Sequence, residues 1–120
     1  MKIRLSAAIL AFAAAIGAGI LCTAYTDRLC AQISSDIESA AQNYDYNALQ
    51  NTKDRWDQKV PVLSAFVPHE HIDEVTEILS RALAFLQNDD HTEFDAEISC
   101  VLHQLYIIST YDTPTLRALF

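Results

Sequence analysis

The chain opens with an uncharged apolar stretch, residues 5–24, which reads LSAAILAFAAAIGAGILCTA. A helix of this length rises about 30 Å, which matches the hydrocarbon thickness of a bilayer. Lys2 and Arg4 precede the stretch, and Asp27 and Arg28 follow it. Because positive flanks stay in the cytoplasm, residues 1–25 are predicted to form a single-pass anchor in membrane lipid, with residues 26–120 outside the cytoplasm.

Removal of this segment by a signal peptidase is the alternative to an uncleaved anchor. Cys22-Thr23-Ala24 offers the small residues of a cleavage site, so that cleavage near Ala24 would release a secreted protein. The apolar run is longer than the roughly 7–15 residues of a typical signal peptide. Its length therefore favours the anchor.

After the anchor, apolar residues recur at helical spacing in four segments, Thr26–Asn43, Tyr46–Ala65, His71–Gln87 and His91–Ser109. The predicted inward faces are Leu29, Ile33, Ile37, Ala40 and Tyr44; Tyr46, Leu49, Trp56, Val60 and Leu63; Ile72, Val75, Leu79, Ala82, Leu83 and Leu86; and Phe94, Ile98, Val101, Leu102, Leu105 and Ile108. Asn43-Tyr44-Asp45 and Asn88-Asp89-Asp90 each offer an Asn to end one helix and an Asp to start the next. Pro68 marks the middle break.

This pattern predicts an all-α fold in which a transmembrane helix is followed by an antiparallel bundle of about four helices. Short connections make neighbours antiparallel, so the bundle should consist of two helical hairpins. The first bundle helix should continue directly from the anchor, because nothing between Ala24 and Leu29 breaks it. Pro61 should kink or fray the end of the second helix. Thr113-Pro114 predicts the cap and first position of a short C-terminal helix over residues 115–120.

Charge and glycine content exclude several classes of function. All 16 acidic residues follow Ala24, together with six of the eight basic residues, so that this part carries a net charge of −10. Such a domain is repelled by phosphates, and we expect no nucleic-acid partner. Both glycines, Gly17 and Gly19, lie in the anchor. The remainder therefore lacks the glycines that phosphate-cradling loops require.

A set of residues outside the anchor resembles a known family. Trp56 is followed by His69-Glu70-His71-Ile72-Asp73, and then by Leu79, Leu83, Leu102 and Leu105. With the anchor and the acidic helical body, these residues resemble the bacterial family named domain of unknown function 4363 over nearly the whole chain. Many relatives carry a second Trp before the His motif, where this chain has Phe66. The resemblance implies a small membrane-anchored helical protein and supplies no chemistry.

His69 and His71 could be taken for metal ligands, but on a helix they point about 200° apart. A structural role explains the stretch better: His69 as a cap and hinge, Ile72 in the core, and Asp73 in a first turn where the helix dipole favours negative charge. Cys100 and His103 lie three residues apart and could supply two ligands, whereas zinc needs about four, or three and water. We therefore expect no metal or other cofactor.

The three cysteines leave a disulfide open. Cys30 and Cys100 could pair across helices outside the cytoplasm, although sequence does not establish their proximity. Independent buried thiols are the simpler expectation.

Two further strips could contact partners. Ala96, Cys100, His103 and Ile107 form a second apolar strip on the last long helix, which either docks a partner or is covered. We expect cover from the first helix or from Leu116, Leu119 and Phe120. In the anchor, Ala7, Ala11, Ala15 and Gly19 form a small-residue ridge that would let another span approach closely, although alanine is also common in apolar segments.

Three functions remain, from different classes. The favoured one is a non-enzymatic interaction or accessory module for another membrane or envelope protein, with homo-oligomers as one form of association. The alternative is a small-ligand sensor with a pocket between the hairpins near Trp56 and Lys53. The third is a metal-dependent enzyme that uses His69 and His71, or Cys100 and His103.

Overall fold

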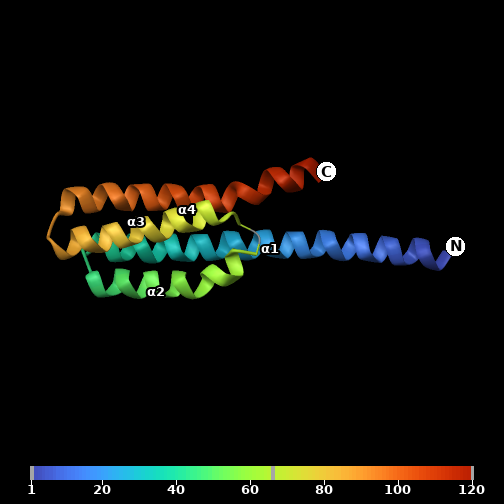
Figure 1. Ribbon diagram of the computed structural model, residues 1–120, viewed down its shortest axis with the longest axis horizontal. Coiled ribbons are helices and arrows are strands. Elements are labelled where there is room, and N and C mark those ends of the chain that lie inside the picture. The colour runs from blue at the N-terminus through green and yellow to red at the C-terminus, as the bar shows by residue number, and fades with distance from the viewer. Residues whose placement is uncertain (1, 66, 120) are drawn as a thin grey trace.

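The computed structural model describes the backbone of residues 2–65 and 67–119 and the side chains of residues 3–65 and 67–110. The described residues form four α-helices: α1 (Lys2–Gln42), α2 (Tyr46–Leu63), α3 (His69–Gln87) and α4 (His91–Leu119). They pack as an antiparallel bundle from which the N-terminal half of α1 projects (Figure 1). The molecule is accordingly elongated, with extents of 69 × 23 × 21 Å. The all-α prediction is confirmed.

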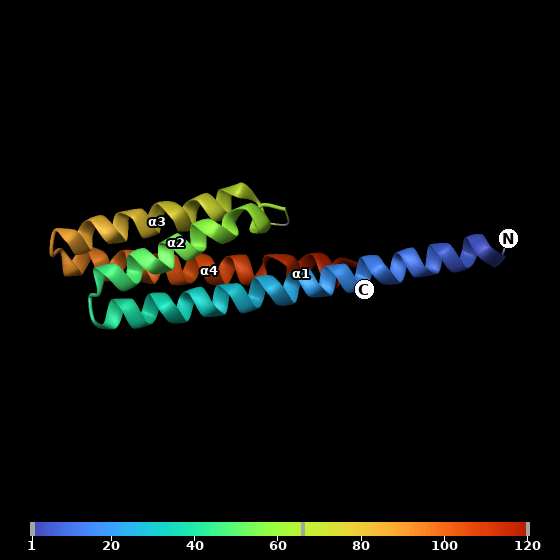
Figure 2. The same ribbon diagram turned by 90° about the horizontal axis from the view of Figure 1, so that it is seen from below.

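The anchor and the first bundle helix are one continuous element, as predicted. The 41 residues of α1 run without a break from the apolar stretch into the bundle, and Figure 2 shows the same continuity from a second side. Among the described helices, α1 is the one long and apolar enough to cross a membrane, judged by length and composition. Such a helix is consistent with a membrane anchor or with a signal sequence. What the structure adds is that the bundle half of α1 is rigidly continuous with it.

The turn between α1 and α2 is set by Tyr44 and Asp45. Tyr44 has a φ of 48°, in the left-handed region, and the amide of Asp45 donates to the carbonyl of Ala40 at 3.0 Å. These are the features of a Schellman C-cap. The carboxylate of Asp45 then accepts from the amide of Ala48 at 3.1 Å and caps α2. One residue thus closes the first helix and starts the second.

The turn between α3 and α4 repeats this geometry. Asp89 has a φ of 56°, and the amide of Asp90 donates to the carbonyl of Phe85 at 2.9 Å. The Asp90 carboxylate accepts from the amide of Glu93 at 3.3 Å. The predicted Asp starts are confirmed at both turns, whereas the left-handed position falls on the residue after each Asn.

The connection between α2 and α3 differs from both turns. Pro61 lies inside α2, which ends two residues later at Leu63. α3 begins at His69, with Pro68 in the N-cap position and no side-chain cap. The capping role predicted for His69 is therefore wrong. The reason is that the backbone carbonyl of Pro68 already accepts from the amide of His71, at 3.2 Å.

The predicted short C-terminal helix is not a separate element. α4 continues through Thr113-Pro114 to Leu119. A proline removes one hydrogen bond from a helix and bends it, which need not end the helix. Figure 1 shows α4 turning away from the bundle axis toward its C-terminal end. We predicted an anchor helix, a bundle of about four helices and a short C-terminal helix. The described residues form these as four continuous helices.

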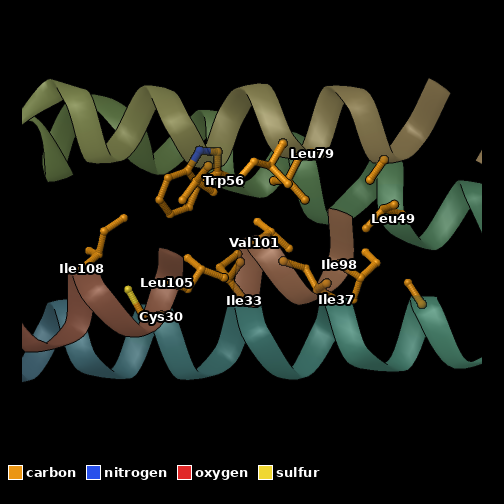
Figure 3. Packing of buried hydrophobic residues seen from close by; sticks show 14 of the residues in the cluster. Cys30, Ile33, Ile37, Leu49, Trp56, Leu79, Ile98, Val101, Leu105 and Ile108 are labelled. Carbon is orange, nitrogen blue, oxygen red and sulfur yellow. The ribbon is translucent and has the colours of Figure 1, made fainter. Parts of the chain in front are cut away.

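The core runs along the whole bundle and contains most of the predicted inward residues. Figure 3 shows side chains from all four helices meeting around Trp56, which is fully buried. Tyr44 and Tyr46, which were predicted on the inward faces, are instead 37% and 38% exposed. Ile78 is buried although it was not on the predicted stripe. Tyr44 lies in the turn after α1 and Tyr46 is the first residue of α2, so both stand at the end of the bundle and not inside it.

Candidate functional site

The projecting half of α1 exposes an unusual amount of apolar surface. Its large side chains leave 53–85% of their surface uncovered; they are Ile3, Leu5, Ile9, Leu10, Phe12, Ile20 and Leu21. Burying apolar area is worth roughly 25 cal/mol per Å², so an apolar environment around this helix would be strongly favourable. Ala7, Ala11 and Ala15 of the predicted ridge are exposed and Gly19 is half-buried. The ridge remains a prediction, since no contact in the structure tests it.

The outer face of α4 is the second candidate surface. Ala96, Cys100 and His103 are exposed and Ile107 is half-buried, so the expected cover by the first helix is not found. The alternative cover, Leu116, Leu119 and Phe120, lies outside the side chains that the structure describes. Tyr106, beside it, is 64% exposed. The cause is geometric, because α4 packs against α1 and α3 and no third helix reaches its outer side.

Polar contacts with α3 fix the rotation of α4 about its own axis. Glu97 pairs with Arg81 at 3.3 Å. Farther along, the amide nitrogen of Gln104 lies 3.1 Å from Nδ1 of His71. These contacts lie on the flank of α4 that faces α3. The outer strip is thereby held toward solvent.

Beyond Glu97, the outer face of α4 carries no charged side chain up to Thr110. No Asp, Glu, Lys or Arg occurs from Ile98 to Thr110, although the chain as a whole carries a net charge of −8. A neutral, partly apolar surface on an acidic protein is where another protein can approach without electrostatic repulsion. We define the outer α4 face by Ala96, Cys100, His103 and Tyr106.

A groove of about 360 Å³ lies between α1 and α4. Its residues are Asp27, Cys30, Ala31, Ser34, Leu102, Leu105, Tyr106, Ser109 and Thr110. It adjoins the outer α4 face through Tyr106. A second groove, of about 270 Å³, lies between α1 and α2 and is mainly polar.

The pocket predicted near Trp56 and Lys53 is not formed by these residues. Trp56 has no exposed surface, and its indole N–H donates to the hydroxyl of Thr76 at 2.9 Å. The Lys53 ammonium pairs with Asp57 at 3.0 Å. A ligand would find neither the indole ring nor an unpaired ammonium there.

The histidine and cysteine pairs do not converge on a third ligand. His69 is exposed, whereas half-buried His71 faces Gln104. The two imidazoles therefore point to different places and do not share a site. Cys100 and His103 are both exposed one turn apart. Within the described residues, no three His, Cys, Asp or Glu side chains gather in a metal-binding arrangement.

Cys30 and Cys100 are both free thiols in different environments. Cys30 is buried on α1, and burial, with a smaller effect of Asp27, raises the pKa of its thiol to about 12. Cys100 is exposed on the opposite side of α4 from the core. The expectation of two buried thiols is right for Cys30 and wrong for Cys100.

One cluster was not found by sequence reasoning. The ring of Tyr44 stacks on His91 with centroids 3.8 Å apart, and it tilts against Phe94. Its hydroxyl donates to the carboxylate of Asp95 at 3.2 Å. Desolvation and this hydrogen bond raise the pKa of Tyr44. The cluster ties the α1–α2 turn to the start of α4, and no sequence pattern signalled it, since Tyr44 was predicted on an inward helix face.

The rest of the predicted structural motif is split between core and surface. Ile72, in the first turn of α3, is buried in the core as predicted, and Asp73 is exposed. Trp56 joins Ile72 indirectly, because the Thr76 hydroxyl donates to the Ile72 carbonyl at 3.1 Å. The motif is therefore a packing element between α2 and α3.

Comparison with known proteins gives one match. A family model described as domain of unknown function (DUF4363) matches residues 22–118. The match begins in the last turn of the apolar stretch and includes the whole bundle. Neither a curated protein nor a solved structure matches the chain.

Proposed function

The chain belongs to the DUF4363 family, whose description names no activity, and we propose from its geometry that it is a membrane-anchored, non-enzymatic helical module. In this proposal α1 holds the bundle outside the cytoplasm, and the outer α4 face binds another protein of the membrane or envelope. The alternative of a cleaved, secreted domain differs in the fate of residues 1–24.

The observation that carries the proposal is the double character of α1. Its N-terminal half exposes large apolar side chains, whereas its C-terminal half buries Leu29, Ile33 and Ile37 in the core. One unbroken helix thus belongs to a bilayer at one end and to the bundle at the other. Cleavage near Ala24 would leave the bundle half of α1 intact, so the domain would also fold after release.

The outer α4 face supports the binding role. The described helices leave this side of α4 uncovered, and it carries no charged side chain from Ile98 to Thr110, while α4 packs against α1 and α3 on its two flanks. A rigid helix that presents an adaptable mixture of apolar and weakly polar side chains suits helix-to-helix docking. Repulsion of a second acidic surface is weakest there.

Location is tested by labelling the native cysteines in intact cells with a membrane-impermeant maleimide. In a Cys22→Ser background exposed Cys100 should react, and adding Cys100→Ser should abolish the labelling while buried Cys30 remains silent. Protection of Cys100 until the cells are lysed would refute the extracytoplasmic placement. Recovery of the labelled protein from the medium, shortened by the anchor, would support secretion instead.

Binding is tested with a photo-crosslinking amino acid at His103 in cells. The control position is Gln58, which is exposed on α2, a helix that is not a direct neighbour of α4 in the described bundle. We expect a crosslinked product from position 103 and none from position 58, and its mass distinguishes a second copy from a different protein. His103→Glu, with the crosslinker moved to Tyr106, should reduce the yield. Equal products from positions 103 and 58 would refute a specific face.

A further inference from the structure

The α2–α3 connection lies at the end of the bundle from which α1 projects. Figures 1 and 2 both place it there, opposite the two Asp-capped turns. Residues 61–68, PVLSAFVP, carry no charged side chain. Within this segment Phe66 lies outside the described residues. An uncharged segment therefore occupies the end of an acidic bundle that is nearest the apolar half of α1.

The depth of this connection follows from α1 and α2. Lys59 lines a small groove together with Tyr25, Arg28, Leu29 and Gln32, so it is level with that part of α1. Because α2 runs antiparallel to α1, each residue after Lys59 moves about 1.5 Å toward the anchor. Residues 62–65 consequently reach the level of about residues 22–25, where the apolar stretch ends.

Several polar groups of the connection are satisfied by local hydrogen bonds. The amide of Val67 donates to the carbonyl of Leu63 at 2.8 Å, and the amide of Ala65 donates to that of Val62 at 3.2 Å. The Ser64 hydroxyl donates to the carbonyl of Val60 at 2.7 Å. Satisfied polar groups are the condition for placing a non-helical segment at a lipid boundary.

Its outward side chains are apolar. Leu63 and Val67 are buried and fix the connection to the core, whereas Val62 is 48% exposed and Pro61 and Ala65 are exposed. We call Pro61, Val62 and Ala65 the apolar rim. In water the exposed rim contributes no hydrophobic stabilisation, whereas insertion into a bilayer would bury its apolar surface beside α1.

We infer that the apolar rim seats in the interface of the membrane that α1 spans and gives the bundle a second contact with lipid. The inference rests on the proposed anchoring of α1. Arg28 and Lys59 lie one to two turns above the rim, but Asp27 and Asp57 stand within two residues of them, and Glu70 and Asp73 follow the rim at the start of α3. The local charge is therefore net negative. Apolar burial drives the contact, so anionic lipid is not required.

The test places a fluorescent NBD probe at the rim of the full chain. Cys22 and Cys100 are replaced by Ser, Cys30 is kept because it is buried, and Val62→Cys supplies the labelling site. Asn47→Cys is the matched control, since it is exposed on the same helix about 22 Å away at the far end. The labelled chains are reconstituted in phosphatidylcholine vesicles that contain nitroxide-labelled lipid.

We expect the nitroxide to remove most of the fluorescence at position 62 and little at position 47. Phosphatidylserine should not change this result. Quenching at 62 that appears only with phosphatidylserine would assign the contact to basic residues and overturn the inference. Absence of quenching at 62, while the protein stays with alkaline-washed vesicles, overturns the inference and leaves the anchor intact. Loss of the protein from the vesicles refutes both the anchor and the rim.

A second variant separates lipid contact from folding. Ala65→Asp places a charge on the rim at an exposed position, and Ala84→Asp does the same on the exposed side of α3. With the probe at Val62→Cys, Ala65→Asp should reduce quenching and Ala84→Asp should not, while far-UV circular dichroism remains that of the parent. Equal quenching in the two variants would overturn the inference.

Discussion

Replacement of Trp56 by alanine is the sharpest test of the core. The indole is fully buried where α2 meets α3, and its N–H donates to the Thr76 hydroxyl at 2.9 Å. Thr76 in turn donates to the carbonyl of Ile72 at 3.1 Å. Trp56→Ala removes the largest side chain of the core and this hydrogen bond together. We expect a cost of about 3–5 kcal/mol in the free energy of unfolding.

This cost is large for a domain of the present size. Single domains are stabilised by about 5–15 kcal/mol, so a cost of about 3–5 kcal/mol removes at least a fifth of the stability and could remove all of it. A loss of 1 kcal/mol lowers the Tm of a domain of 60–100 residues by about 4–8 °C. The variant should therefore melt about 12–40 °C below the parent.

Two milder substitutions separate the hydrogen bond from the packing. Thr76→Val keeps the shape but leaves the indole N–H without its acceptor, at a cost of about 1–3 kcal/mol. Trp56→Phe keeps much of the ring and removes the donor. When both are combined, the cost should be smaller than the sum, because no unpaired group is then left behind. Additive costs would show that the hydrogen bond contributes nothing.

Thermal unfolding is followed by far-UV circular dichroism of the full chain in detergent. Trp56 is the only tryptophan of the chain, so its fluorescence is lost in the Trp56 variants and cannot serve as a common probe. A Trp56→Ala protein that melts within a few degrees of the parent would refute the placement of this residue in the core.

Three further results are expected. Burial raises the pKa of Cys30 to about 12 from a reference of 9.0, so Cys30 stays protonated at pH 8 and should react with maleimide far more slowly than exposed Cys100. Above about pH 9 the thiol loses its proton in the unfolded chain before it does in the folded one. The free energy of unfolding should therefore fall as the pH rises toward 12. Ala11→Leu with Ala15→Leu should abolish crosslinking between anchors, if the ridge mates with another span, because the added bulk separates the helix backbones. Asp89→Gly should raise stability by up to about 1 kcal/mol in thermal unfolding, because Asp89 has a φ of 56°, where glycine bears no steric penalty.

Each of these results has a control. Denaturant should equalise the maleimide rates of Cys30 and Cys100, and unequal rates after unfolding would remove burial as the cause. For the anchor, Ala13→Leu changes a position away from the ridge and should leave crosslinking unchanged; loss in this variant as well would point to a general defect in insertion. For the turn, Asp89→Ala should not stabilise the protein, because only glycine relieves the strain at a positive φ.

The sequence by itself determined the helices and most of the core. Periodicity of 3.6 residues places Leu29, Ile33 and Ile37 on one side of a helix wherever that helix packs, so their burial could be predicted without a partner in view. The Asp starts at Asp45 and Asp90 were equally readable, because an N-cap bonds to its own next turn. The apolar length of the first segment depends on composition alone.

Whether the side of a helix that faces away from the core is covered was decided by the tertiary structure. Periodicity marks the strip of Ala96, Cys100 and His103 as apolar, but only the position of the other helices shows that nothing described lies over it. The stacking of Tyr44 on His91 joins residues 47 positions apart, which no local pattern encodes. The depth of the apolar rim likewise depends on how far α2 extends alongside α1. Local spacing fixes which way a side chain points on its own helix, whereas the packing of separate helices fixes what it meets.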